Sequence, residues 1–178
     1  MIRGLLLILV LLTSTPREPS LLEVQSYAIQ FTIANAGLDV EGSFGKMTAE
    51  IRFDPADVTN SALQASVDVS SIKTGIELRD KHLLGREYFY AEKFPLIKLE
   101  SKTIRGISKS KYTGTFLVTI RDITKEMEIP FSVLRKGKNL ILKGDFALNR
   151  LDFGIGTDSI ILSNKVEVHI EVVAQPKR

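Results

Sequence analysis

The chain of 178 residues contains no cysteine, no tryptophan and only two histidines. Without cysteine there is no disulfide and no cysteine-ligated zinc, and two histidines are poor material for a transition-metal site. A strong charge of one sign is also lacking, because 24 Lys and Arg residues face 21 Asp and Glu residues, for a formal net charge of +3. Basic residues do not cluster with aromatics, so no nucleic-acid partner is expected. No cofactor is expected either.

Long hydrophobic runs are scarce as well. The run from Leu5 to Leu12 is too short for a membrane-spanning helix, which needs about 20 residues. Arg3 precedes it and small residues follow it, the pattern of a signal peptide. We therefore expect a signal peptide over residues 1–15, with a cleavage site as late as residue 23, and one domain over residues 24–175. This predicts a periplasmic or secreted protein without a transmembrane anchor; an uncleaved N-terminal anchor and a mistaken start codon are the alternatives.

Beyond residue 24 the dominant pattern is the alternation of apolar and polar residues. In residues 166–172, for example, valine and isoleucine alternate with glutamate and histidine. This period of two is typical of a strand with one buried face. It recurs seven more times, over residues 27–33, 47–53, 63–69, 97–100, 113–120, 127–133 and 140–148. Residues 77–84 lack it and suit a short helix that Gly85 would end.

Eight strands with short connections predict antiparallel neighbours. Closing the sheet into a barrel buries its apolar face and removes its edges, so we expect an all-β, eight-stranded antiparallel barrel with one short helical segment. A sandwich fits the alternation nearly as well. A membrane barrel with its apolar face outward is disfavoured, because the chain has no Trp and only four Tyr for aromatic girdles.

The apolar face is therefore interpreted as the barrel lumen. A barrel of eight strands is either packed solid or holds one small ligand, and alternation alone does not separate the two. The candidate lumen residues are Ile29, Phe31, Phe53, Val67, Ile97, Leu99, Phe116, Val118, Phe131, Phe146 and Ile170.

The stretch without alternation carries the most specific motif. Residues 71–83 contain S-I-K-T-G and R-D-K-H-L, and residues 88–95 add Y-F and F-P. Further pieces follow the same order along the chain: V-E-G-S-F at 40–44, V-T-I-R-D-I-T-K at 118–125 and N-R-L-D-F-G-I at 149–155. Together they closely resemble the YceI-like family, from about residue 27 to residue 174. The resemblance implies a lipocalin-like barrel that binds polyisoprenoids or other long amphiphiles.

Two positions depart from the family pattern. Asp122 stands where the family usually has glycine, and Phe116 stands where a strand glycine is usual. Phe116 shares a face with Val118, so an inward ring predicts a cavity that is shorter or shaped for a different chain.

The charged residues of the motifs admit two interpretations. Asp80 and His82 are two residues apart and do not face each other on a helix, which disfavours a catalytic triad. We expect no catalytic residues and no metal site. The pairs Arg79 with Asp80 and Arg150 with Asp152 are interpreted as ion pairs that close a barrel end, or alternatively as contacts to a ligand headgroup.

The sequence therefore predicts a secreted or periplasmic protein, not an enzyme, whose apolar cavity holds a polyisoprenoid or a similar long amphiphile. The alternative is a solid-cored, stress-related interaction module without a lipid ligand. A homodimer remains open.

Overall fold

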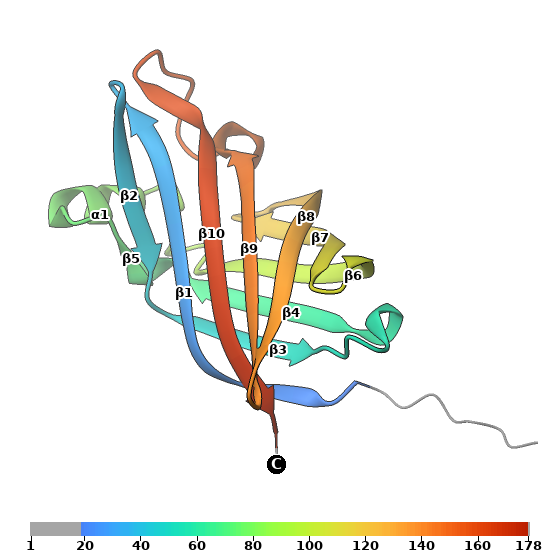
Figure 1. The fold of residues 1–178 in the computed structure, drawn as a ribbon. Helices are drawn as coiled ribbons and strands as arrows, with labels where there is room; N and C mark the ends of the chain where they lie inside the picture. The colour runs from blue at the N-terminus through green and yellow to red at the C-terminus, as the bar shows by residue number, and fades with distance from the viewer. Residues whose placement is uncertain (1–18, 178) are drawn as a thin grey trace, which may run out of the picture.

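The computed structural model describes residues 19–177 and consists almost entirely of strands (Figure 1). The predicted signal peptide lies outside the described residues. The strands are β1 (Leu21–Asn35), β2 (Leu38–Phe44), β3 (Met47–Arg52), β4 (Ala62–Asp68), β5 (Ile72–Lys73), β6 (Leu96–Ser108), β7 (Lys111–Ile120), β8 (Ile123–Lys136), β9 (Asn139–Asn149) and β10 (Leu162–Pro176). The α-helix α1 spans Glu77–Leu83, and the short 3-10 helices are η1 (Val58–Asn60), η2 (Val69–Ser71) and η3 (Arg150–Phe153).

The strands close into an antiparallel barrel of eight. Pairing runs through β1, β3, β4, β6, β7, β8, β9 and β10, and β10 pairs back with β1 along most of its length. The chain bends between β2 and β3 and again between β4 and β5, so each pair forms two parts of one barrel strand. The predicted eight-stranded all-β barrel with one short helix is confirmed, and no helix among residues 19–177 is long and apolar enough to cross a membrane.

The bend between β2 and β3 is stabilised by two side chains from other elements. The Tyr27 hydroxyl donates to the carbonyl of Gly45 and accepts from the amide of Met47, each at 3.0 Å. The Ser71 hydroxyl accepts from the amides of Gly45 and Lys46 at 3.2 and 3.0 Å. These bonds replace the ladder bonds that the bend interrupts, because backbone polar groups inside a barrel need partners. Ser71, the first residue of the S-I-K-T-G motif, thus has a structural role.

One end of the barrel is packed solid. The ring of Phe53 lies edge-on to that of Tyr112 at 5.1 Å, and Tyr112 stacks on Phe131 at 5.5 Å. Phe116 lies edge-on to Phe131 at 6.2 Å, above this cluster. This end also holds both chain ends of the barrel, where Leu22 and Ala174 are buried.

At the other end the inward side chains are not fully covered. Phe31, Phe146 and Ile170 face the interior but are only half-buried. Such partial exposure of inward residues means that the strands enclose space that side chains do not fill. The barrel is therefore closed and solid at the β6–β7 and β8–β9 turns and hollow towards the β1–β2 turn, a direction that runs upward in Figure 1.

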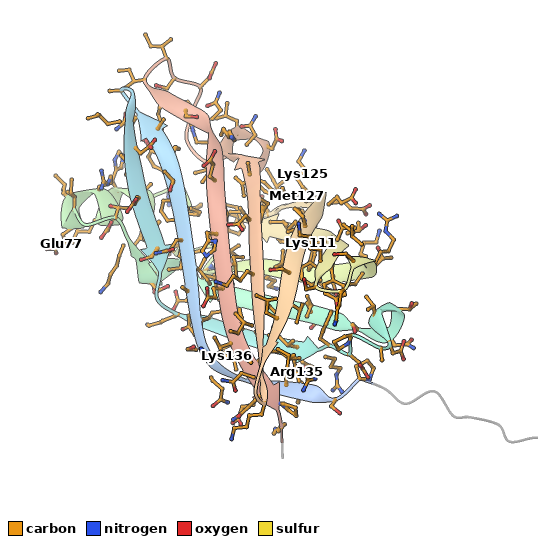
Figure 2. All side chains as sticks on the ribbon, viewed as in Figure 1. Glu77, Lys111, Lys125, Met127, Arg135 and Lys136 are labelled. Atoms are coloured by element: carbon orange, nitrogen blue, oxygen red, sulfur yellow. The ribbon has the colours of Figure 1, made fainter. Side chains whose placement is uncertain are left out.

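The outer face of the barrel is charged, as Figure 2 shows. Opposite charges meet across neighbouring strands: Lys143 lies 2.7 Å from Glu171, and Lys102 lies 2.7 Å from Glu126. Exposed pairs of this kind contribute about 0–1 kcal/mol each, so they add little to the stability of the barrel. Charges of both signs therefore lie side by side on the outer wall.

Candidate functional site

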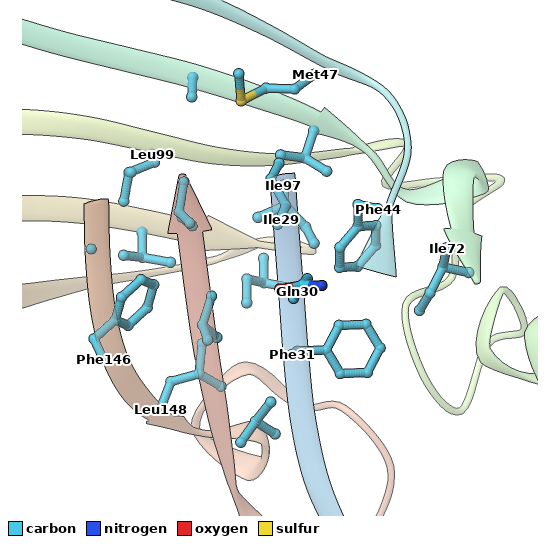
Figure 3. A pocket seen from close by; sticks show the side chains of 18 of the residues that line it. Ile29, Gln30, Phe31, Phe44, Met47, Ile72, Ile97, Leu99, Phe146 and Leu148 are labelled. Carbon is cyan, nitrogen blue, oxygen red and sulfur yellow. The ribbon is translucent and has the colours of Figure 1, made fainter. Parts of the chain in front are cut away.

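The hollow half of the barrel contains a cavity of about 400 Å³. Its wall is almost entirely aliphatic and aromatic, with β1, β9 and β10 on one side and β3, β4 and β6 on the other (Figure 3). Cavities of 300–1,000 Å³ with apolar walls are typical of small-ligand sites. Ten of the predicted lumen residues line it: Ile29, Phe31, Val67, Ile97, Leu99, Phe116, Val118, Phe131, Phe146 and Ile170.

Phe53 is the exception, and the prediction that it lines the cavity is wrong. Its side chain does face the barrel interior, but it belongs to the packed end and is only 3% exposed. Alternation identifies which face a residue lies on and carries no information about its height along the barrel axis. Phe53 ends its strand at the closed end, where Tyr112 and Phe131 fill the space around it.

Phe116 forms the floor of the cavity. It is 2% exposed, contacts the packed rings below and faces the hollow above. The ring also covers Gly114 on the same strand, where an added Cβ would lie 2.5 Å from a ring atom. The glycine therefore lets the ring lie flat against the wall, and the ring limits the lumen at this height. That the cavity is shorter than one with glycine at this position stays a prediction.

Several cavity residues were not predicted. Phe44 lies 5.6 Å from the ring of Phe31, as Figure 3 shows for the two side chains, and 6.1 Å from the ring of Phe89. All three rings line the cavity and form one corner of it. Phe44 lies in the V-E-G-S-F motif, which the resemblance singled out without assigning a role. Phe89 comes from the turns after α1, and no periodic pattern could have placed it.

The empty space itself depends on two small residues. Ala49 of β3 and Ala65 of β4 lie directly opposite each other in the sheet, and both line the cavity. Leucine or phenylalanine at either position would fill part of the hollow. In the sequence, the open cavity is therefore indicated by alanine at inward positions of the alternating strands. A search for large apolar side chains does not identify these positions.

Two chain segments form the mouth of the cavity. One is α1 with the turns that follow it, from which Arg79, His82 and Tyr88 reach the wall; the other is the loop between β9 and β10. The amide of Gly156 in that loop donates to the carbonyl of Glu87 at 2.7 Å, so the two segments are joined. The mouth is therefore bordered by segments that contact each other.

Arg79 and Asp80 do not pair with each other in the described chain. Both bind Thr74, because the Thr74 amide and hydroxyl donate to one Asp80 oxygen at 2.8 and 2.6 Å. Arg79 Nε donates to the Thr74 hydroxyl at 2.7 Å, and Nη2 donates to the Thr74 carbonyl at 2.5 Å. The predicted ion pair is thus replaced by a clamp that fixes α1 to the end of β5.

Arg150 is the most deeply buried charged side chain of the described residues, at 2% exposure. It donates to the carbonyls of Ile155 and Thr157 at 2.8 Å each. Further bonds reach the Ser163 and Leu162 carbonyls at 3.0 and 3.4 Å and the Asn164 side chain at 2.9 Å.

Asp152 is exposed and is not among the partners of Arg150, so the predicted Arg150–Asp152 pair is wrong. Spacing in sequence suggested it, but η3 directs the arginine inward and the aspartate outward. The positive charge of Arg150 acts instead on Asp158. The pKa of Asp158 is lowered by hydrogen bonds from Asn164 and Ser159 and, to a smaller extent, by the charge of Arg150.

Neither histidine belongs to a catalytic arrangement in the described residues. His82 Nε2 lies 3.7 Å from Glu87, and its ring is edge-on to Tyr88 at 5.0 Å. His169 contacts Asp145 at 2.5 Å on the outer wall, where the sequence predicted a charged face. No hydroxyl is hydrogen-bonded to either ring, and residues 19–177 contain no cluster of three or more acidic or histidine side chains that could hold a metal. The arrangement can enclose an apolar chain, and its polar groups serve the structure of the mouth.

Comparisons with known proteins agree with this geometry. The model of the YceI-like domain matches residues 22–174. A UPF0312 protein of Pseudomonas fluorescens is 26% identical over 160 residues, which cover 83% of this chain and 81% of that protein.

Two solved structures share the fold. BcnA of Burkholderia cenocepacia superposes with a TM-score of 0.83 at 24% identity, over 86% of this chain and 99% of that one. A polyisoprenoid binding domain from Saccharophagus degradans, implicated in plant cell wall breakdown, superposes with a TM-score of 0.72 at 10% identity, over 90% and 100% of the two chains.

Proposed function

Because the chain belongs to the YceI-like family, we propose that it is a binding protein, without catalytic activity, that holds one long apolar or amphiphilic molecule such as a polyisoprenoid. The observation that carries the proposal is the cavity of about 400 Å³ with its apolar wall and polar, hydrogen-bonded mouth. The neighbour from Saccharophagus degradans is named for polyisoprenoid binding and has the same fold, which supports this choice of ligand.

The volume limits how much of a ligand fits inside. With about 30 Å³ for each small molecular unit, 400 Å³ holds about 13 methylene-sized groups. This corresponds to roughly two to three isoprene units, so a longer chain has to extend through the mouth. Each buried methylene contributes about 0.8 kcal/mol, so affinity rises with chain length and levels off once the cavity is full.

The alternative of a solid-cored interaction module fits only half of the barrel. The packed cluster of Phe53, Tyr112 and Phe131 matches it, but the half-buried inward residues Phe31 and Phe146 do not. A core that served only stability would not leave a void of this size, because interiors pack to the density of organic crystals.

The site of action is part of the proposal. The apolar run at residues 5–12 after Arg3 supports export to the periplasm or the medium. Edman sequencing of the native protein tests this: the first residue should lie after Leu12, between residues 15 and 23. Met1 on protein from the cytoplasm would refute it.

A cavity-filling variant tests the binding site. Ala65→Phe places a ring in the hollow, whereas Ala28→Phe places the same ring on the exposed outer side of β1. A fluorescent fatty-acid probe should bind the wild type and Ala28→Phe, and isoprenols should displace it from both. Ala65→Phe should lose most of the binding at unchanged circular dichroism. Equal binding by both variants would exclude the cavity as the site.

A further inference from the structure

Aliphatic side chains are exposed around the mouth of the cavity. Eight large hydrophobic residues are exposed in the described chain. Four of them lie at α1 or on the β9–β10 loop, the two segments that border the mouth, and Leu38 lies at the start of β2, beside that loop. Ile160 is fully exposed at 105%, and Leu38 and Leu78 are exposed to 73% and 78%. Concentrations of exposed apolar groups at one place on a monomer mark interaction sites. The five residues are Leu38, Ile76, Leu78, Ile160 and Ile161.

Three of these residues lie on two adjoining loops. The amide of Ala36 in the β1–β2 turn donates to the carbonyl of Ile161 at 2.9 Å. In the register of the sheet, Asn35 pairs with Leu38 on one side and Leu162 on the other. Leu38, Ile160 and Ile161 therefore lie close together, and we call these three residues the apolar tip. The β1–β2 turn and the β9–β10 loop that carry them lie at the top of Figure 1.

The loop that carries Ile160 and Ile161 is held in shape from inside. Arg150 binds the carbonyls of Thr157 and Leu162 on either side of the two isoleucines. The Ser159 hydroxyl accepts from the amides of Ile161 and Leu162 at 3.1 and 3.2 Å. Several backbone polar groups around the tip thus have partners within the protein, while the side chains of Ile160 and Ile161 are exposed to water.

The charges beside the tip do not favour a polyanionic or polycationic partner. Asp39 adjoins Leu38, Asp158 precedes Ile160, and Lys165 follows on β10. Such a sparse and mixed set provides no electrostatic attraction, so the occupant that fits the apolar tip is a hydrocarbon surface. A lipid bilayer is also the phase in which a long apolar ligand dissolves.

We propose that the apolar tip inserts into the surface of a lipid bilayer, so that the ligand passes between the membrane and the cavity without crossing water. The proposal rests on the proposed function for its ligand. Each methylene group exposed to water lowers the equilibrium fraction of ligand that is free in water by about fourfold. For a long chain, transfer directly between the membrane and the cavity therefore avoids a large free-energy barrier. The amphipathic loops would lie in the headgroup region, as interfacial anchors do.

Vesicle sedimentation tests the docking step. Phosphatidylcholine vesicles should sediment the wild-type protein, and the double variant Ile160→Ser, Ile161→Ser should bind at least about tenfold more weakly. The control is Ile107→Ser, Leu134→Ser, which removes two exposed aliphatic residues at the closed end and should retain wild-type binding. All these positions are exposed, so folding should be unaffected. No sedimentation of the wild type, or an equal loss in both double variants, would overturn the proposal.

A second measurement separates docking from ligand binding. Fluorescent fatty-acid probe delivered in cyclodextrin should bind the tip variant and the wild type equally, whereas transfer of the same probe from vesicles should be slower for the tip variant. Binding from cyclodextrin with equal transfer rates would refute docking and leave the proposed function intact. Absence of binding from both sources, with vesicle sedimentation retained, would refute the proposed function alone.

Discussion

Replacing Phe116 with alanine should lengthen the cavity and change which ligands bind best. The ring forms the floor between the hollow half and the packed aromatic end. Its removal opens roughly 100 Å³, which at about 24 cal/mol per Å³ accounts for about 2.4 kcal/mol of a total loss of about 3–5 kcal/mol in folding free energy.

The same space becomes available to the ligand. At about 30 Å³ for each unit, 100 Å³ admits about three more methylene groups. Each contributes about 0.8 kcal/mol, so the longest isoprenols should gain about 2.4 kcal/mol, or roughly fiftyfold in affinity, over those that already fit the wild type. The assay is probe displacement by isoprenols of increasing length, with the chain length at which affinity levels off compared between the two proteins.

Phe53→Ala is the matched control. Phe53 is a buried phenylalanine of the same aromatic cluster, 3% exposed, that does not line the cavity. The Phe53→Ala variant should lose a similar amount of folding free energy, but its affinity should level off at the same isoprenol chain length as that of the wild type. If Phe116→Ala and the wild type level off at the same chain length, the cavity floor is not where the ligand ends, and the reasoning fails.

Three further predictions concern the stability of the barrel. Arg150→Lys should lower the free energy of unfolding, measured in urea, by about 3 kcal/mol or more, because a single ammonium cannot replace the five hydrogen bonds of the buried guanidinium. An unchanged midpoint of the urea transition would contradict the role of Arg150 in shaping the loop. Tyr27→Phe should lower the free energy of unfolding by about 1–3 kcal/mol, because the Gly45 carbonyl and the Met47 amide at the β2–β3 bend lose their hydrogen-bond partner. Tyr90→Phe should change it little, because the Tyr90 hydroxyl makes no hydrogen bond in the described chain. Hydrogen bonds from the hydroxyl and amide of Ser70 lower the pKa of Asp68, so the contribution of the Asp68 carboxylate to folding stability is present above about pH 4 and is lost as the pH falls through the folded-state pKa. The stability difference between the wild type and Asp68→Asn should therefore shrink in acid. A difference that stays constant with pH would disprove this role of the carboxylate.

The sequence predicts the barrel and most of the cavity wall because alternation is a local signal. In β1, Ile29 and Phe31 face inward wherever the strand pairs, so their side of the sheet follows from period two alone. The mouth could not be predicted in this way. Phe89 and the partners of Arg150 come from turns and loops whose course depends on contacts made only after the barrel closes.

The hollow itself is the least predictable feature. Phe116 and Phe131 fill the lumen at one height along the barrel axis, and Ala49 and Ala65 leave it open at another. These heights decide where inward side chains meet across the lumen. Phe53 and Phe31 have the same pattern in sequence, yet one is buried among rings and the other faces the cavity. Height along the axis follows from strand register, which the pattern does not specify.

Mass spectrometry of an organic extract from the purified protein shows directly whether the barrel holds a long apolar molecule. We expect a co-purified molecule with a long hydrocarbon chain in the wild type and in Ala28→Phe, and its loss from Ala65→Phe. Repeated absence of such a molecule from the wild type, together with no uptake of the fluorescent fatty-acid probe, would contradict the proposed function.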